Sequence, residues 1–312
     1  MSTPVFAGSR TRGHYESYYL RAVDPDAPRA VWIRYTVLRR PGGAPAGSLW
    51  CTVWDAAAGP PAAVKSTPGV ALPGDWLAIG GARFGPTAVS GRAIAGPRSA
   101  IWELSVVDAA PPLRHLPHPL LYGAPLPRTK LESPAPAARL SGTVEADGRR
   151  LDLDGWPGMI GHNWGSQHAE RWLWLHGTGF DGSPDAWLDV AVGRVSIGAA
   201  TTPWIANGAL QLEGRRHRLG GMRARAVVDA VPGEATVTLG DARIHVRAPL
   251  DQTIAWVYAD PPGGEHHSLN CSIAALEVEL GGRSLATSHG GVYELGVRER
   301  DHGVPVAPFP DP

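Results

Sequence analysis

The chain has 312 residues, of which 43% are hydrophobic, enough for one large domain or two of ordinary size with a buried core. Lys plus Arg and Asp plus Glu number 29 each, so no net charge draws the protein to nucleic acid or to an anionic membrane. The N-terminal residues lack the apolar stretch of a signal peptide, and no apolar run is long enough for a membrane span. We therefore expect a cytoplasmic protein with no nucleic-acid partner and no membrane span.

Short segments of alternating apolar and polar residues follow one another along the chain and predict β-strands. The 39 Gly and 30 Pro residues are scattered, so few windows remain in which a helix could run for three turns. Because no helices alternate with the strands, the pattern indicates antiparallel sandwiches or barrels. The predicted strands cover residues 14–20, 29–40, 48–56, 99–108, 139–146, 171–177, 186–192, 234–240, 253–260, 272–280 and 291–297.

The first predicted strand carries aromatic and polar side chains on both faces. Alternation puts Glu16 and Tyr18 on one side and Tyr15, Ser17 and Tyr19 on the other. Glu16 has two interpretations, either a pocket carboxylate or an edge-strand charge that discourages aggregation. We retain Glu16 and Tyr18 as candidate ligand-binding residues.

The segment 108–140 is dense in proline, a residue excluded from strand interiors. We expect a long connection within the first half of the chain, because the strand pattern resumes at Leu140. The boundary between two β domains is predicted near residues 165–171, which gives domains of residues 1–166 and 167–312. Both fall within the usual size of a domain.

The stretch 161–177, GHNWGSQHAERWLWLHG, concentrates tryptophan and histidine. In its strand, alternation places Trp172, Trp174 and His176 on one face and two leucines on the other, so both faces carry side chains that prefer burial. One face is therefore predicted to pack in a core, and the aromatic face is predicted to meet a second apolar surface or a cavity.

The next strand places Trp187 and Asp189 on one face. A carboxylate in such a strand costs free energy unless it is paired, hydrogen-bonded or part of a site. In the structural interpretation, Asp189 accepts an indole N–H or pairs with an arginine such as Arg194. In the catalytic interpretation, desolvation raises its pKa so that it protonates an alkene or enol. Tryptophan faces then stabilise the cation, and His162 or His176 orients the acid.

Other sequence signals for cofactors and metals are weak. The sequence GTGFDG at 177–182 fits a dinucleotide fingerprint, but no helix follows it, so a hairpin loop is predicted. Cys51 and Cys271 are too few for a cysteine-based zinc site. We expect no metal and no cofactor. Any metal site would need ligands gathered by the tertiary fold from irregularly spaced histidines, namely His162, His168, His176, His266 and His267.

The run 139–165, RLSGTVEADGRRLDLDGWPGMIGHNWG, with the Trp-x-Trp that follows it, resembles the carotenoid hydratase/AttH-like family. Relatives of that family include tocopherol cyclase and lipocalin-like Diels–Alderases. The resemblance is strongest over residues 139–192, and weaker similarities lie at 16–20 and in SHGGVYELG at 288–296. It implies two lipocalin-like β domains side by side with an apolar ligand site, and hydration, cyclisation or cycloaddition of apolar substrates.

The resemblance also implies site residues. The family's hydratases are proposed to use H-x-W and a later aromatic-x-Asp, which fall here on His162 and Trp164 and on Trp187 and Asp189, with Trp187 where a tyrosine is expected.

We predict an all-β chain of two lipocalin-like (calycin) β-barrel or sandwich domains. It binds a small apolar molecule, a polyene, terpenoid or polyketide, and catalyses an acid-assisted cyclisation, isomerisation or hydration. The alternative is a non-catalytic carrier. The predicted catalytic residues are Asp189 and His162, and the predicted binding residues are Trp164, Trp172, Trp174, His176, Trp187, Glu16 and Tyr18.

Overall fold

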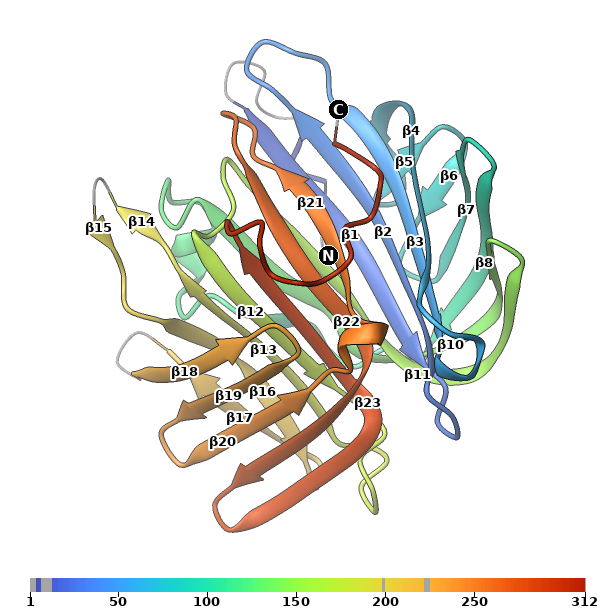
Figure 1. Ribbon diagram of the computed structural model, residues 1–312. Helices are drawn as coiled ribbons and strands as arrows, with labels where there is room; N and C mark the ends of the chain where they lie inside the picture. The colour runs from blue at the N-terminus through green and yellow to red at the C-terminus, as the bar shows by residue number, and fades with distance from the viewer. Residues whose placement is uncertain (1–3, 7–12, 198–199, 222–224, 312) are drawn as a thin grey trace.

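The computed structural model describes residues 4–6, 13–197, 200–221 and 225–311, which form antiparallel strands in two barrels that lie side by side (Figure 1). No α-helix occurs in these ranges, and the regular helices there are short 3-10 turns. None of them has the length and apolar character needed to span a membrane. The predicted all-β fold with two barrel domains is confirmed.

The first barrel closes on itself. β1 pairs with β2 on one side and with β11 on the other, and the sheet continues through β8 to β10, which pairs with β11 again. Its strands are β1 (His14–Val23), β2 (Arg29–Arg39), β3 (Ala46–Asp55), β4 (Ala62–Pro73), β5 (Leu77–Ile79), β6 (Ala82–Phe84), β7 (Ala88–Ala95), β8 (Arg98–Val107), β10 (Thr129–Ala146) and β11 (Arg149–Gly165), with η2 (Ala56–Ala58) between β3 and β4.

The proline-rich segment differs from its prediction, because β10 begins at Thr129 rather than near Leu140. Its pairing with β11 shifts register on both sides of Ala135. Pro134 and Pro136 therefore fall at bulges, where a missing N–H breaks no ladder. The connection is thus shorter than expected, and it contains β9 (Leu113–Arg114), which pairs with β10, and η3 (Pro119–Tyr122).

The second barrel is nearly closed, with strand order β17-β16-β13-β12-β23-β22-β20-β19-β18 and with β21 paired to β22. Its strands are β12 (Arg171–Gly177), β13 (Trp187–Arg194), β16 (Ile205–Leu212), β17 (Arg215–Gly220), β18 (Ala226–Val231), β19 (Glu234–Leu239), β20 (Ala242–Arg247), β21 (Ile254–Ala259), β22 (Glu265–Leu280) and β23 (Arg283–Val297). A small ribbon, β14 (Ser196–Ile197) and β15 (Ala200–Thr201), and the turn η4 (Leu250–Gln252) complete it.

The strand faces follow the predicted alternation. Leu173 and Leu175 of β12 belong to the core of the second barrel, whereas Trp174 lies on the opposite face in a cluster with Tyr19 of β1. On β1, Tyr18 belongs to the core of the first barrel, so Tyr19 points out of it. The two barrels therefore meet through the outer faces of these strands.

Aromatic side chains fill much of the junction between the barrels. The ring of Trp256 lies 6.2 Å from that of Trp32 and 5.0 Å from that of Trp50, between centroids. Arg21, which is fully buried, donates from Nη2 to the Ser272 carbonyl across the junction at 2.7 Å. The domain boundary expected between residues 166 and 167 falls in the segment that joins β11 to β12, and it stays a prediction.

Candidate functional site

A cavity of about 470 Å³ lies at the junction of the two barrels. The first barrel contributes side chains from β1 and β2, the second contributes side chains from β12, β21 and β23, and the connection that carries β9 covers another side. Because both barrels supply walls, the cavity exists only in the assembled chain. Its aromatic lining is made by Tyr15, Tyr19, Trp32, Trp172, Trp174 and Tyr258.

Two oppositely charged groups also line this cavity. The guanidinium of Arg34 lies 4.1 Å from the centre of the Tyr258 ring, and Arg34 is only 4% exposed. Glu294 accepts hydrogen bonds from Nε1 of Trp172 at 3.0 Å and from Nδ2 of Asn270 at 3.1 Å. Both charges are held against aromatic walls, so the cavity suits an apolar molecule that carries a polar group.

Asp189 is fully buried beside the cavity on β13. Its Oδ1 accepts from Nε1 of Trp174 at 3.0 Å, and its Oδ2 accepts from the Ser133 hydroxyl. Burial alone would raise the pKa of Asp189, but the charge and hydrogen bond of His115 and the hydrogen bond from Ser133 lower it on balance. The expectation of a raised pKa is therefore wrong, and the carboxylate is ionised because it is hydrogen-bonded and paired.

The structural interpretation gave Asp189 either an indole N–H or an arginine as its partner. The indole prediction is confirmed, and the arginine prediction is wrong. Trp174 supplies the indole N–H to the carboxylate. Arg194 instead donates from Nε to the Thr202 carbonyl at 3.1 Å. The side chain that pairs with Asp189 is thus His115, a residue that the sequence pattern did not single out.

His115 lines the cavity and contacts Asp189 behind it. Its Nδ1 lies 3.1 Å from the carbonyl of Asn207, and its Nε2 lies 3.2 Å from Oγ of Ser133 and 3.3 Å from Oδ2 of Asp189. Both ring nitrogens therefore face oxygen acceptors, the arrangement that a protonated imidazole satisfies. His115 thus lies between the Asp189 carboxylate and the cavity.

His176 faces Asp189 across the pair β12 and β13 and is fully buried. Its Nε2 donates to the carbonyl of Pro136 at 3.0 Å. Burial is the main cause that lowers the pKa of His176 to about 4, against the opposing effect of Asp189. His176 is therefore a neutral neighbour of the carboxylate at neutral pH.

The other predicted catalytic residue, His162, belongs to a different cluster. Its ring stacks on that of Tyr18 with centroids 4.0 Å apart and on that of Trp164 at 4.4 Å. Its Nε2 lies 2.8 Å from Oε1 of Glu16. Since Tyr18 lies in the core of the first barrel and Asp189 on β13 of the second, the two predicted catalytic residues do not share one site.

Glu16 is a buried acceptor rather than an edge-strand charge. β1 has a partner strand on each side, so it has no free edge along this register. The backbone N–H groups of Val5 and Phe6 donate to the Glu16 carboxylate at 2.7 to 3.0 Å. Burial would raise the pKa of Glu16, but His14, whose Nε2 lies 3.6 Å from Oε2, and the hydrogen bond with His162 lower it to about 2.

The predicted binding residues lie in several different parts of the structure. Trp172 and Trp174 line the cavity. Trp187 packs against Leu113, with the guanidinium of Arg216 5.0 Å from its ring centre. Of the remaining predicted binding residues, His176 lies beside Asp189. The others lie in the His162 cluster, namely Glu16, Tyr18 and Trp164.

Sequence reasoning missed several polar residues that line the cavity, among them His115, Arg34 and Glu294. Arg34 and Glu294 each interrupt an apolar strand, and this is the signal that singled out Asp189. His115 lies in a connection without periodicity, and its contacts with residues 133, 189 and 207 depend on the tertiary fold.

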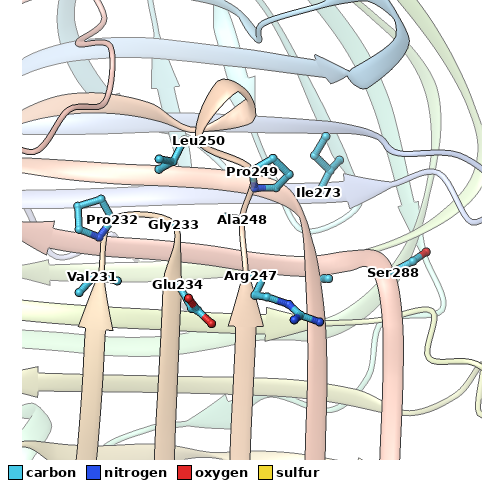
Figure 2. Close-up of a pocket in the computed structure, with 11 residues that line it drawn as sticks. Val231, Pro232, Gly233, Glu234, Arg247, Ala248, Pro249, Leu250, Ile273 and Ser288 are labelled. Carbon is cyan, nitrogen blue, oxygen red and sulfur yellow. The ribbon is translucent and has the colours of Figure 1, made fainter.

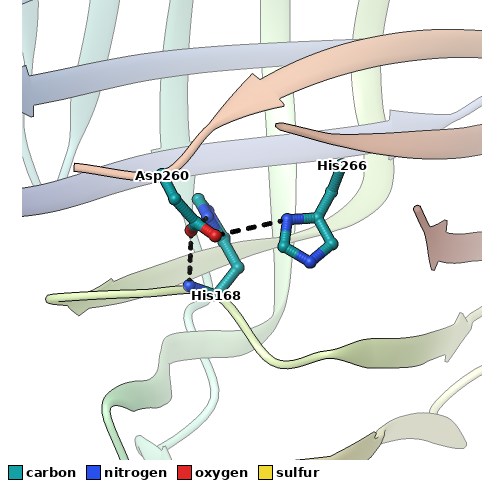
Figure 3. Close-up of side chains that lie close together, drawn as sticks. All are labelled: His168, Asp260 and His266. Atoms are coloured by element: carbon teal, nitrogen blue, oxygen red, sulfur yellow. Dashed lines mark hydrogen bonds and ion pairs between the residues drawn. The ribbon is translucent and has the colours of Figure 1, made fainter. Parts of the chain in front are cut away.

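One group of residues could hold a metal ion. His168, Asp260 and His266 each offer one ligand atom, and these three atoms lie within 4.8 Å of one another (Figure 3). His168 also lines the junction cavity. The tertiary fold has gathered two of the histidines that seemed too irregularly spaced in the sequence for a metal motif.

A second, open cavity of about 460 Å³ lies on the second barrel, beside the ends of β18 and β20 and the start of β19 (Figure 2). Small and apolar residues dominate its lining, which includes Pro232, Ala248, Pro249 and Ile273. Its ionisable side chains are Glu234 and Arg247. It has no arrangement comparable to the His115–Asp189 pair, so the junction cavity is the stronger candidate site.

The similarity to known proteins extends over nearly the whole chain. No protein-family model matches it. Two curated proteins of Mycobacterium tuberculosis, the uncharacterized proteins MT0513 (strain CDC 1551 / Oshkosh) and Rv0493c (strain ATCC 25618 / H37Rv), are each 27% identical over 294 residues. The alignment covers 92% of this chain and 87% of each relative.

Two crystal structures share the fold. One is of a candidate AttH protein from Nitrosomonas europaea, with a TM-score of 0.55, 14% identity and coverage of 95% of this chain and 99% of that one. The other is of kievitone hydratase from Nectria haematococca, with a TM-score of 0.53, 10% identity and coverage of 96% and 91%. The chain therefore has the two-barrel fold of a candidate AttH protein and of a hydratase.

Proposed function

We propose that the protein binds a small apolar molecule in the junction cavity and catalyses an acid-assisted hydration, isomerisation or cyclisation. The observation that carries the proposal is the aromatic cavity with His115 in its wall and the ionised Asp189 behind His115. The shared fold with kievitone hydratase supports hydration among these reactions. Cyclisation and cycloaddition rest on the sequence resemblance alone, and the cytoplasmic location stays a prediction.

In the proposed reaction, protonated His115 keeps Nε2 beside Asp189 and gives the proton of Nδ1, otherwise directed at the carbonyl of the cavity residue Asn207, to an electron-rich double bond of a polyene or enol. The π electrons form the new C–H bond and leave a carbocation. Asp189 stabilises the imidazolium before transfer, and Ser133 holds the carboxylate in position. The faces of Trp172 and Trp174 stabilise the cation by roughly 0.5–2 kcal/mol each.

The fate of the carbocation distinguishes the three reactions. Addition of water, with loss of its proton to neutral His115, completes a hydration. Loss of a proton from a neighbouring carbon to the same imidazole gives an isomer. Attack by a second double bond of the substrate, followed by proton loss, gives a ring. In each case His115 ends protonated, so the catalyst is regenerated.

The experiment is incubation of the protein with a panel of polyenes, terpenoids and polyketides in H₂¹⁸O and separately in D₂O. Hydration adds one labelled oxygen to the product, and isomerisation or cyclisation adds deuterium at carbon without added oxygen. Asp189→Asn and His115→Gln should each reduce turnover by roughly 10²–10⁴-fold. Asp154→Asn, which changes an exposed carboxylate on β11, is the matched control and should keep full turnover.

The alternative function is that of a carrier, because an apolar cavity can bind ligands without chemistry. Native mass spectrometry of protein purified without added ligand would then detect a bound small molecule that is released unaltered. Recovery of every panel compound unlabelled and unchanged would favour the carrier. Equal turnover in both site variants and the control would remove His115 and Asp189 from the mechanism.

A further inference from the structure

Three segments far apart in the sequence bring together His168, Asp260 and His266. His168 lies in the segment between β11 and β12, Asp260 directly follows β21, and His266 lies in β22. Oδ1 of Asp260 accepts from the backbone N–H and from Nδ1 of His168, both at 2.8 Å. Oδ2 of Asp260 lies 3.6 Å from Nδ1 of His266 (Figure 3).

Several polar atoms of this cluster are buried without a hydrogen bond to any described residue. They are both ring nitrogens of His266, Nε2 of His168 and Oδ2 of Asp260. His266 and Asp260 are 0% exposed. A buried polar atom left without a partner costs free energy, so a cluster with four of them requires an explanation.

Aromatic side chains hold the two imidazoles in position. The Tyr15 ring stacks on that of His168 with centroids 3.9 Å apart. The Trp172 ring lies 5.8 Å from that of His168 and 5.3 Å from that of His266. Such packing fixes the rotamers of the two imidazoles and limits access of water, as a preorganised ligand set requires.

The charge balance around the cluster is compatible with a bound cation. Asp260 is acidic, and the nearest cationic side chain, Arg298, lies 3.9 Å from Oδ2 of Asp260. Arg298 is itself paired with Glu170 through Nε at 2.7 Å.

We propose that His168, Asp260 and His266 bind one divalent transition-metal ion, with zinc as the representative ion. Imidazole nitrogens and a carboxylate oxygen are zinc ligands, and their donor atoms are already within 4.8 Å of one another. An ion here would satisfy buried atoms on all three residues and would fasten the segment that joins the barrels to β21 and β22. The site borders the same cavity as His115 through His168, but none of its three residues takes part in the proposed chemistry.

The test measures metal binding rather than activity. The full chain is dialysed against EDTA, and ZnCl₂ is then titrated by calorimetry, with thermal unfolding recorded with and without zinc. We expect one equivalent of bound zinc and a higher unfolding temperature with zinc. His266→Gln and Asp260→Asn should weaken zinc binding by roughly 100-fold or more. His217→Gln, on β17, is the control and should bind zinc like the unchanged chain.

A second measurement keeps the proposal testable if either variant fails to fold. Co²⁺ added to the unchanged chain should give visible absorption bands of a nitrogen- and oxygen-ligated ion, and zinc should displace them. Failure of the folded chain to bind zinc or Co²⁺ would overturn the proposal and assign the unpartnered atoms to buried water. Zinc binding by folded His266→Gln with unchanged affinity would also overturn it. Neither result would affect the proposed role of His115.

Discussion

His115 and Asp189 lie 3.3 Å apart, between Nε2 and Oδ2, and join the two halves of the chain at the cavity. His115 belongs to the connection that leads into the first barrel's β10, and Asp189 belongs to β13 of the second barrel. Ser133 of β10 bonds to Asp189 and lies 3.2 Å from His115. A polar network thus crosses the junction where the aromatic walls meet, and its members can be tested one at a time.

Removal of the Ser133 hydroxyl should measure how strongly this network holds the barrels together. Ser133→Ala takes a donor from the buried Asp189 carboxylate, so we expect a loss of about 1.5–3 kcal/mol in the free energy of unfolding. Urea unfolding at pH 7 provides the measurement. Ser105→Ala, which removes an exposed hydroxyl bonded to a carbonyl, should change stability by less than about 0.5 kcal/mol. Equal losses in both variants would contradict the role of Ser133.

Glu16 should make the first barrel sensitive to acid. Its pKa is lowered from 4.5 to about 2 in the folded chain, so the ionised carboxylate contributes roughly 3 kcal/mol of stability. Because the folded pKa is the lower one, this contribution is complete above pH 4.5 and is lost as the pH falls towards 2. Glu16→Gln should therefore be less stable than the unchanged chain at pH 7, and the difference should shrink in acid.

The measurement for Glu16 is urea unfolding at several pH values between 7 and the acid limit of the fold. Glu103→Gln on β8, where the side chain is exposed, serves as the control and should follow the unchanged chain at every pH. A constant difference between Glu16→Gln and the unchanged chain across this range would contradict the assigned titration.

The position of Trp172 depends on glycine in one of its two neighbouring strands. Trp172 lies opposite Gly296 of β23 and Gly193 of β13. A Cβ on Gly296 would come within 2.1 Å of the Trp172 ring, whereas a Cβ on Gly193 would meet its nearest atom at 3.6 Å. Gly296→Ala should therefore destabilise the chain by about 1–3 kcal/mol.

The matched variant Gly193→Ala should be neutral or slightly stabilising, since its new methyl group has ordinary contacts. Thermal unfolding of both variants gives the comparison. Displacement of the Trp172 ring in Gly296→Ala should also weaken its bond to Glu294 and change the tryptophan fluorescence. Similar stability of the two variants would show that the ring is not held in the position described.

Asp311 near the C-terminus should contribute strongly to stability. Lys65 of β4 is buried, and it contacts the Asp311 carboxylate, donates to the Pro310 carbonyl at 2.9 Å and lies 3.9 Å from the Trp50 ring centre. Asp311→Asn leaves this ammonium without its counter-charge, at a cost of about 3 kcal/mol. Lys65→Met added to Asp311→Asn should restore part of the loss, because the buried charge is then gone.

Urea unfolding of the single and double variants measures this coupling. Asp301→Asn, which changes an exposed carboxylate, is the control and should leave stability within about 0.5 kcal/mol. A double variant less stable than Asp311→Asn alone would contradict the argument, since it would show that Lys65 stabilises the chain without Asp311.

Strands with clear alternation were predictable, and those without it were not. The predicted strand 171–177 has the bounds of β12, and its two faces point as expected. The region 62–95 gave no prediction, because β4 contains Gly and Pro and because β5 and β6 are three residues long. The alternation of apolar and polar residues indicates which face of a strand is buried, but it does not indicate which short strands pair with each other.

The candidate site was only partly predictable for a related reason. Asp189 could be singled out because a buried carboxylate in an apolar strand needs partners. The sequence motif suggested that His162 acts with it, yet β11 carries His162 within the first barrel. His115 and Asp260 could not be assigned, because their contacts are made with residues far along the chain.

The cavity lies outside both barrels, and this location affects how such proteins can change their ligands in evolution. Leu173 and Leu175 belong to the core of the second barrel, whereas Trp172 and Trp174 lie on the opposite face of the strand and line the cavity, which Leu173 also borders. Alternation along β12 thus gives the core packing mainly to the leucines and the ligand contact mainly to the tryptophans. Mutations at the outward positions can alter ligand preference while the inward leucines preserve the scaffold, so one architecture can accommodate new ligands through successive single substitutions.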